Sequence, residues 1–325
     1  MRVLFVSSGN DERYTIAPFI KSQGDSLVEQ GVAVDYFPIL GKGMWSYFKS
    51  IPQLKKHLRT HQYDLVHAHY SLCGWVAVLA AGRLPVILSL MGDDALGTYR
   101  GPNKIDFKSK LLSLLALAIQ PFVKAIISKS PNLEKVVYRK KISYLVPNGV
   151  RMDQFKATSA ASRKALGLQE GKKYVLFLGS PIDENKNISL ARAAVASLKR
   201  SDVELLNVYD VPHDVVVQYL NATDVFVLCS FSEGSPNVVK EAMTCGCPMV
   251  VTPAGDAPWV IGDTPGCFVG THDPAHFASQ LEKALAFATQ EGKTKGRQRI
   301  LELGLDAKTI ATKIISIYQS LTSNT

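Results

Sequence analysis

The sequence predicts an α/β protein of two Rossmann-like, doubly wound domains whose parallel sheets face each other across a cleft. Three observations lead to this fold class. Short apolar runs alternate with amphipathic helical patterns along the chain, which is typical of repeated βαβ units. The alternation is interrupted once, near residues 148–170, where a Pro-Asn-Gly turn precedes a weakly patterned Thr/Ser/Ala stretch. The length of 325 residues also fits about two domains.

The first domain is expected over residues 1–150. Its strands are predicted by short runs rich in β-branched and aromatic residues, at 3–7, 32–37, 64–69, 85–90, 124–129 and 143–147. Its helices are predicted by helical spacing of the apolar residues between these runs, at 14–30, 44–61, 72–82, 107–120 and 130–138. Helices that connect successive strands are what parallel pairing requires.

The second domain is expected over residues 151–325. Its strands are predicted at 173–180, 203–209, 224–229, 248–253 and 266–270. Its helices are predicted at 187–200, 212–221, 236–245, 274–290 and 306–322, the last being a candidate to cross back to the first domain. Parallel sheets bind ligands at the carboxyl ends of their strands. The loops that hold Gly9, Gly179 and Glu233 are therefore the first places to look for a site.

Composition indicates a protein of the cytoplasm. The longest apolar run, Leu111–Ile119, has nine residues, whereas a bilayer-spanning helix needs about 20. The N-terminus enters a strand pattern directly, so no signal peptide is expected. Five cysteines without framework spacing fit a reducing compartment. Cys245 and Cys247 are interpreted as buried thiols rather than metal ligands, since no second Cys/His pair stands at ligand spacing.

The positive charge is concentrated in the first half. Residues 1–150 hold 19 Lys/Arg and 10 Asp/Glu, whereas residues 151–325 hold 18 of each. Residues 42–59 contain five Lys/Arg and no acid, interleaved with Trp45, Tyr47 and Phe48. This mixture predicts contact with an anionic membrane surface, and the alternative is a surface helix with buried aromatic residues. Nucleic acid is not an expected partner, because no nucleic-acid-binding motif is present.

A turn followed by a helix is predicted around Gly-Ser-Pro-Asn. Pro236 favours the first helical turn and Gly246 favours the end of the helix. The N–H groups around Gly234, Ser235 and Asn237 then lie at a helix N-terminus, which attracts phosphate. Glycine also allows a ligand to come close to the backbone.

Two carboxylates flank this turn, Glu233 before the helix and Glu241 inside it. A carboxylate accepts hydrogen bonds from hydroxyl groups, so one site could hold a ribose, a diphosphate and a sugar in a row. The alternative is structural: Glu233 would cap the helix, and Glu241 would be a surface residue.

Residues 231–256, FSEGSPNVVKEAMTCGCPMVVTPAGD, resemble the nucleotide-sugar motif of the retaining glycosyltransferases of family 4, which have the GT-B fold. The linker VPNGVRMDQF and the segments YDLVHAHYSLCGWVAVLA, LSLMGDDALG and APFIKSQGDSLVEQG are similar to other parts of that family. The resemblance covers most of residues 1–260. It implies that the first domain holds the acceptor and the second holds the nucleotide-sugar donor.

The resemblance assigns roles to individual residues. Glu233 would contact the donor sugar, Glu241 the nucleotide ribose and Lys186 the diphosphate. Ser180 stands near the place where the family often has an arginine, so one cationic contact is missing. Gly9 occupies the family's glycine-rich turn near the donor, but this chain has a single glycine there, and a structural turn is the other interpretation.

The usual histidine after the fourth strand is replaced here by Met91. Asp93 or Asp94 is a candidate to take over its contacts with the sugar or to accept the proton of the incoming hydroxyl. The alternative is that Asp94 caps the next segment. His67 and His69, which alternate along one strand, are expected to point to opposite faces, with His69 toward the cleft.

The resemblance implies retaining transfer of a sugar from a nucleotide-sugar to a glycan or lipid-linked acceptor in bacterial polysaccharide or glycolipid biosynthesis. No cofactor and no required metal are expected, and the protein would act at the inner face of the cell membrane. One alternative is a non-catalytic sugar-nucleotide-binding protein of the same fold, because the usual Arg and His are missing. A nucleotide-dependent oxidoreductase would need G-x-G-x-x-G after the first strand, where this chain has SSGND.

Overall fold

The computed structural model describes residues 1–10, 14–41, 43–99, 101, 104–158 and 163–323. The chain forms two compact units. The first unit comprises Met1–Thr98, Ile105–Gly149 and Ala307–Thr325, and the second comprises Tyr99–Lys104 and Val150–Asp306. The first unit is therefore assembled from three separate stretches of the chain.

The first unit contains one parallel sheet with the strand order β2-β1-β3-β4-β5-β6. The strands are β1 (Arg2–Ser8), β2 (Ala33–Ile39), β3 (Leu65–His69), β4 (Val86–Ser89), β5 (Ala125–Ser128) and β6 (Ser143–Leu145). β4 and β5 are buried along their whole lengths. A strand that is covered on both faces has no polar side, which is why both strands are apolar up to the serine that ends each of them.

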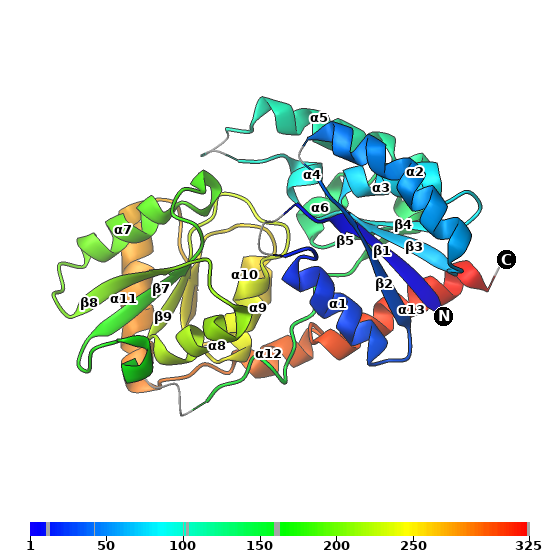
Figure 1. Cartoon of the computed structure of the whole chain (residues 1–325). Helices are drawn as coiled ribbons and strands as arrows, with labels where there is room; N and C mark the ends of the chain where they lie inside the picture. The colour runs from blue at the N-terminus through cyan, green and yellow to red at the C-terminus, as the bar shows by residue number, and fades with distance from the viewer. Residues whose placement is uncertain (11–13, 42, 100, 102–103, 159–162, 324–325) are drawn as a thin grey trace. The chain divides into compact units, whose positions relative to one another are not determined.

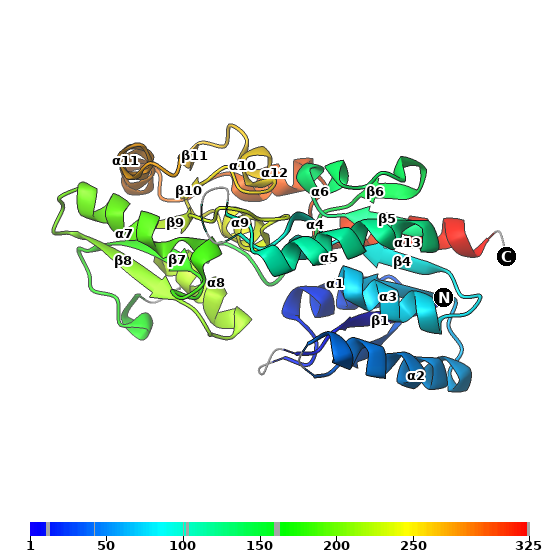
Figure 2. The ribbon, with the colours of Figure 1, turned by 90° about the horizontal axis from the view of Figure 1, so that it is seen from above.

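Helices cover both faces of this sheet. α2 (Met44–Thr60), α3 (Ser71–Ala80) and α5 (Phe107–Ala118) lie on one face, and α1 (Pro18–Val28) and α13 (Ala307–Thr322) lie on the other (Figures 1 and 2). The shorter helices are α4 (Asp93–Leu96), α6 (Pro131–Lys135) and the 3₁₀ turns η1 (Gln120–Phe122) and η2 (Lys140–Ile142). Tyr318 of α13 reaches β3, where its hydroxyl oxygen is 2.5 Å from His67 Nδ1. The last helix is thus part of the core of the first unit.

The second unit contains a parallel sheet with the order β11-β10-β9-β7-β8. Its strands are β7 (Lys173–Leu178), β8 (Val203–Val208), β9 (Val225–Leu228), β10 (Met249–Val251) and β11 (Cys267–Val269). Its helices are η3 (Arg163–Leu166), η4 (Glu184–Lys186), α7 (Ile188–Ser197), α8 (His213–Ala222), α9 (Asn237–Thr244), α10 (Ala257–Ile261), α11 (Pro274–Gln290) and α12 (Gly296–Glu302). α7 and α11 pack together over a core that includes Phe177 and Phe277, and α9 packs against α10 and α12 (Figure 1).

The predicted fold class of α/β units with parallel sheets is confirmed, and every predicted strand is present. The predicted helix at 14–30 begins only at Pro18, which occupies the first helical position. α4, α10 and α12 were not predicted, because their four to seven residues display no clear apolar period. The helix predicted at 130–138 is present only as the five residues of α6. All five cysteines are free and buried, as interpreted from the sequence. Among the described residues, no helix combines the length and hydrophobicity of a membrane span.

Candidate active site

Lys186 and Glu233 form an ion pair in the second unit. Lys186 ends η4 in the loop after β7, and Glu233 lies in the loop after β9. The distance from Lys186 Nζ to Glu233 Oε1 is 2.6 Å, and Ser230 Oγ donates a hydrogen bond of 2.8 Å to the same oxygen. β7 and β9 are adjacent parallel strands, so their carboxyl ends bring the two loops together. Two residues that the resemblance links to the diphosphate and to the donor sugar are therefore in contact.

Asn185 fixes the geometry of this ion pair. Its side chain donates a hydrogen bond to the Ser232 carbonyl (2.9 Å) and accepts one from the Ser232 N–H (3.1 Å). Its own carbonyl accepts a hydrogen bond from the Phe231 N–H (2.9 Å). These three bonds tie the Lys186 loop to the Glu233 loop. Asn185 was not predicted from the sequence, although its place next to the candidate ligand Lys186 was a signal that could have indicated it.

Gly179 lies beside the Lys186 side chain. A Cβ atom at Gly179 would lie 3.4 Å from Lys186 Cγ, an ordinary van der Waals distance, and 3.3 Å from the Phe177 ring. Two hydrogen bonds hold the Gly179 backbone. Its N–H donates to the Val208 carbonyl (3.1 Å), and its carbonyl accepts from Asn207 Nδ2 (2.9 Å). Gly179 thus lies at the site, next to Lys186.

The turn before α9 is packed tightly. Pro236 is the N-cap residue of α9, and no side chain caps the helix, so Glu233 is not its cap. Gly255 has φ +61°, and a Cβ there would lie 2.4 Å from the Gly234 carbonyl oxygen. Only glycine therefore allows the following turn to approach the Glu233–Gly234 backbone. Gly234 is buried, and Gly246 ends α9 with φ +68°, as predicted.

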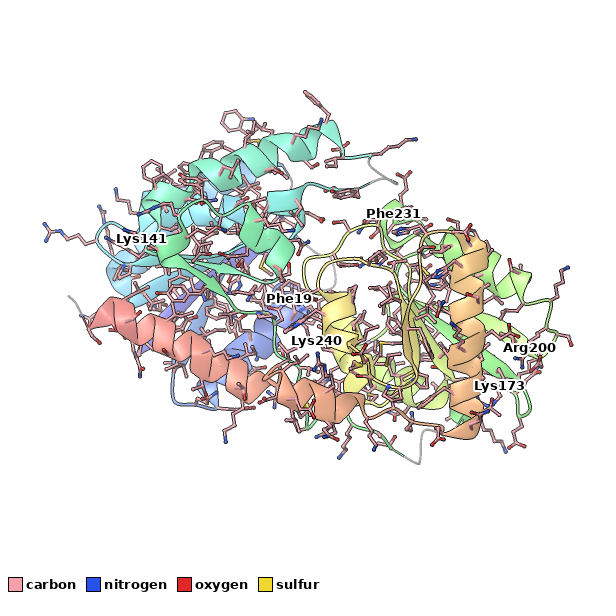
Figure 3. The ribbon with its side chains drawn as sticks, turned by 180° about the vertical axis from the view of Figure 1, so that it is seen from behind. Phe19, Lys141, Lys173, Arg200, Phe231 and Lys240 are labelled. Carbon is pink, nitrogen blue, oxygen red and sulfur yellow. The ribbon has the colours of Figure 1, made fainter. Side chains whose placement is uncertain are left out.

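Two buried polar groups lie at the start of α9. Ser235 Oγ donates a hydrogen bond of 2.6 Å to Asp256 Oδ2, and Asp256 is 3% exposed. Asp256 Oδ1 and Asn237 Oδ1 are buried and have no hydrogen-bond partner among the described residues. Lys240 follows on α9 (Figure 3). Burial raises the pKa of the Asp256 carboxyl and lowers the pKa of the Lys240 ammonium. The helix start thus presents two acceptor oxygens that no described residue satisfies.

Glu241 is held by His213. His213 Nε2 is 3.0 Å from Glu241 Oε1, and Glu241 is only 7% exposed, so it is not the surface residue of the alternative interpretation. The Glu241 carboxylate raises the pKa of His213. His213 also packs edge-on against the ring of Phe155, with 5.0 Å between ring centroids. No sequence pattern indicates His213, which is 28 residues away from Glu241 and joins it only through the fold.

This pair predicts a pH-dependent contribution to stability. The folded protein binds the His213 proton more tightly than the unfolded chain does, so the pair stabilises the fold below pH 6.5 and loses this effect as the pH rises through the raised pKa. His213 is about one-third exposed, so the contribution is below about 1 kcal/mol. We expect His213→Gln to lower the melting temperature at pH 5.5–6 and to have little effect at pH 9. An equal loss at both values would contradict the charged pair.

Asp94, in the first unit, is fully buried and accepts backbone hydrogen bonds through both carboxylate oxygens. Oδ2 accepts from the N–H of Ser71 (2.8 Å), the first residue of α3, and Oδ1 accepts from Met91 (3.0 Å) and Gly92 (3.1 Å). Burial raises its pKa to about 6, although the N–H groups favour the charged form. Asp94 is itself the second residue of α4, whose N-cap is Gly92, so it does not cap the segment that follows it. Its carboxylate instead caps the start of α3 and holds the loop after β4. Asp93, beside it, is exposed.

His67 and His69 point to the same face of the sheet, so the expectation of opposite faces is wrong. Their rings stack with centroids 4.3 Å apart, because side chains two residues apart in a strand lie on the same side. Both are buried, and burial lowers the pKa of each well below its usual value, which keeps both rings neutral. His67 binds Tyr318 and Ser89, whereas the ring nitrogens of His69 have no hydrogen-bond partner among the described residues.

Gly9 follows β1 and packs against the end of β2. Its N–H donates a hydrogen bond to the Ile39 carbonyl (2.9 Å), and a Cβ would lie 2.8 Å from both Pro38 Cβ and Leu40 Cδ2. This close packing explains why glycine is required at position 9 without any contact to a ligand. Lys42, in the basic segment 42–59, lies outside the described residues. Across the described parts of the chain, no three potential metal ligands of the His, Cys, Asp or Glu type come together.

Two family models match the chain. The model for glycosyltransferase family 4 matches residues 3–154, and the model for glycosyl transferases group 1 matches residues 208–286. The family 4 match lies almost entirely in the first unit, and the group 1 match lies in the second. The group 1 match includes Glu233 and Glu241.

Curated relatives are similar to much of the chain. A Bacillus subtilis protein described as a teichuronic acid biosynthesis glycosyltransferase, TuaC, is 28% identical over 61% of this chain. The chain spans 55% of TuaC, about half of its length. An Escherichia coli enzyme named UDP-Gal:alpha-D-GlcNAc-diphosphoundecaprenol alpha-1,3-galactosyltransferase is 26% identical, and the match covers 74% of this chain and 72% of that enzyme.

Among solved structures, sucrose-phosphate synthase from Thermosynechococcus elongatus matches with a TM-score of 0.82 and 19% identity over the whole of both chains. At this identity the match concerns the fold. The parallel sheets of both units and the fold match show the GT-B fold, and the two family models identify a glycosyltransferase match in each unit, to family 4 in the first and to group 1 in the second.

Proposed function

We propose that this protein is a retaining glycosyltransferase that moves a hexose from a nucleotide-sugar to a glycan or lipid-linked acceptor. The observation that carries the proposal is the Lys186–Glu233 ion pair, 2.6 Å long, in the loops beside the start of α9. The cation and the helix N-terminus suit the diphosphate of a nucleotide-sugar, and the carboxylate suits the hydroxyl groups of its sugar.

Lys186 and Glu233 would exchange partners when the donor binds. The diphosphate carries more negative charge than the Glu233 carboxylate, so it competes for the Lys186 ammonium. The released carboxylate can then accept hydrogen bonds from the donor sugar. Lys186 and the N–H groups at the start of α9 offset the charge that develops on the diphosphate as the glycosidic bond breaks. We therefore propose that transfer requires no metal.

In this proposal, the departing diphosphate oxygen takes the proton of the acceptor hydroxyl directly. In retaining transfer on one face of the sugar, the acceptor oxygen bonds to the anomeric carbon as the bond to the diphosphate oxygen breaks. That departing oxygen takes the hydroxyl proton. No protein base is needed, which fits Met91 at the place of the family's histidine and Asp94 with both oxygens occupied by backbone N–H groups.

The nucleotide ribose would bind Glu241. We expect one nucleotide-sugar among UDP-, GDP-, ADP- and CMP-sugars to raise the melting temperature. A donor concentration about 100-fold above Kd would increase the free energy of unfolding by about 2.7 kcal/mol. Glu241→Gln should lose this response, because its single carbonyl oxygen cannot accept from His213 and two ribose hydroxyls together. A thermal-shift assay measures both.

Glu282→Gln is the matched control, since Glu282 is an exposed carboxylate on α11 in the same unit. It should respond as the wild type does. An undiminished response in Glu241→Gln would exclude the ribose contact, while the Glu233 assignment would still rest on transfer rates. The first donor class to test is the UDP-sugars, since the Escherichia coli relative is named for UDP-Gal.

The acceptor is proposed to be linked to a lipid at the inner face of a bacterial membrane. The same relative is named for a diphosphoundecaprenol acceptor. In this chain, the exposed cations Lys49, Lys55, Lys56 and Arg59 of α2 would contact anionic lipid headgroups. This contact would bring the first unit to the surface that carries the acceptor.

A non-catalytic sugar-nucleotide-binding protein is the second candidate. Met91 and Ser180 favour it, because each replaces a polar or cationic residue that the resemblance expects near the donor. A protein of this kind would give the thermal shift but neither transfer nor donor hydrolysis. Assays of both reactions with the stabilising donor separate the two functions.

A further inference from the structure

A cavity opens between α2, α3 and α5 in the first unit. Its volume is about 230 Å³, and its walls include Tyr47 and Ile51 of α2, Trp75 and Leu79 of α3, and Leu115 of α5. The Trp75 indole N–H donates a hydrogen bond to the Leu115 carbonyl (3.1 Å), so its polar atom is satisfied and the ring faces the cavity as an apolar surface. Small-molecule pockets measure about 300–1,000 Å³. A narrow apolar cavity below that range suits a hydrocarbon chain better than the polar head group of a lipid.

Large apolar side chains surround the cavity. Trp45 is 77% exposed and Leu114 is 61% exposed, and Phe48, Leu79 and Leu111 are each exposed by about half. These residues come from the same three helices, which lie side by side on one face of the sheet (Figures 1 and 2). Scattered apolar residues are normal on a surface, but a concentration of this kind marks a contact with a partner or a membrane.

The charges on these helices have one sign. α2, α3 and α5 contain no Asp or Glu. Trp45, Lys49, Lys56 and Arg59 recur at i, i+4, i+11 and i+14, so the aromatic ring and the cations share one stripe of α2. Lys110 adds an exposed cation on α5. Apolar side chains beside cations, without acids, are complementary to an anionic lipid leaflet.

We propose that the cavity between α2, α3 and α5 binds one hydrocarbon chain of a lipid drawn from an anionic membrane. The inference extends the membrane contact proposed for α2 and rests on it. The cations would contact headgroups, the exposed apolar side chains would enter the leaflet, and one chain would lie along Trp75 and Leu115. A protein partner fits less well, because protein interfaces are depleted in lysine.

The fluorescence of Trp75 can report whether a hydrocarbon chain occupies the cavity. The protein has three tryptophans, and Trp45→Phe with Trp259→Phe leaves Trp75 alone. In this background we expect vesicles of phosphatidylglycerol and chain-brominated phosphatidylcholine to quench Trp75 fluorescence. A single-chain brominated detergent below its micelle-forming concentration should quench it too, without a bilayer. Sedimentation with the same vesicles measures surface binding separately.

A matched pair of variants tests the cavity. Leu115→Phe fills it, whereas Leu114→Phe makes the same change on an exposed residue of the same helix. Leu79→Phe also narrows the cavity, from a half-exposed position. It replaces Leu115→Phe as the filling variant if Leu115→Phe does not give a native circular dichroism spectrum. We expect the filling variant to lose quenching by lipid and by detergent and to sediment normally, and Leu114→Phe to retain quenching.

Other results overturn the proposal in distinguishable ways. Equal quenching in the filling variant and in Leu114→Phe, or sedimentation without quenching, excludes the chain site and leaves the surface contact standing. Failure to sediment with anionic vesicles, or unchanged sedimentation when Lys49, Lys55, Lys56 and Arg59 are replaced by Gln, excludes the surface contact and the chain site with it. Neither result bears on the donor site, which the thermal shift of Glu241→Gln tests.

Discussion

Glu233→Gln is expected to lower the rate of sugar transfer by about 10²–10³-fold, the usual effect of removing one group that acts on the transition state. The amide keeps the size of the carboxylate but carries no charge and has one acceptor oxygen. It can neither pair with Lys186 nor receive two sugar hydroxyls as strongly as a carboxylate can. The nucleotide contacts, by contrast, involve Glu241 and the start of α9, so the thermal shift with the free nucleoside diphosphate should persist.

The measurement is a steady-state transfer assay with the stabilising donor, combined with the nucleoside diphosphate thermal shift. Glu184→Gln is a suitable control, because Glu184 begins the same 3₁₀ turn as Lys186 but has no role in the proposal. A Glu233→Gln variant with the wild-type rate would refute the role of Glu233 toward the donor sugar. Loss of both transfer and nucleotide response would instead indicate that the Lys186–Glu233 pair holds the site together.

Asp94→Ala is expected to destabilise the first unit by about 3 kcal/mol or more. The change leaves the N–H groups of Ser71, Met91 and Gly92 buried without an acceptor, and each such loss costs about 1–3 kcal/mol. Asp94 also helps to hold Tyr70, which precedes Ser71 and has φ +89°, a conformation that side chains rarely adopt. Removal of the carboxylate therefore removes one of the contacts that maintain this backbone.

Thermal and denaturant unfolding of Asp94→Ala measure the effect. Asp93→Ala is the matched control, since the neighbouring carboxylate is exposed, and its effect should stay within about 0.5 kcal/mol. If Asp94→Ala unfolded like the wild type but lost transfer, Asp94 would act on substrate, and the capping interpretation would have to be abandoned.

The sequence was informative wherever the signal is local. Strands such as Val86–Ser89 and helices such as Pro274–Gln290 follow from apolar runs and periodicity within a few residues. The contact between Lys186 and Glu233 was also within reach, because loops after adjacent parallel strands meet at one edge of the sheet. The two-residue period of a strand already placed His67 and His69 on one face, so the error there lay in the application of the rule.

Long-range partners were not within reach. Nothing near His213 in the sequence indicates Glu241, and Asp94 reaches Ser71 across 23 residues through the packing of α3 against the loop after β4. The choice between cap and catalyst for Asp94 depended on burial and on the direction of three N–H groups, which a sequence pattern does not contain. The roles of the donor-site residues still rest on the resemblance and on their geometry.

The place of α13 in the core of the first unit has a consequence for biogenesis. Residues 1–149 are synthesised before the second unit, but the helix that supplies Tyr318 to His67 is synthesised after it. Until then α1 covers its face of the N-terminal sheet without α13, and the first unit cannot complete its core. A nascent chain that stalls before residue 307 therefore exposes an apolar surface to chaperones and proteases.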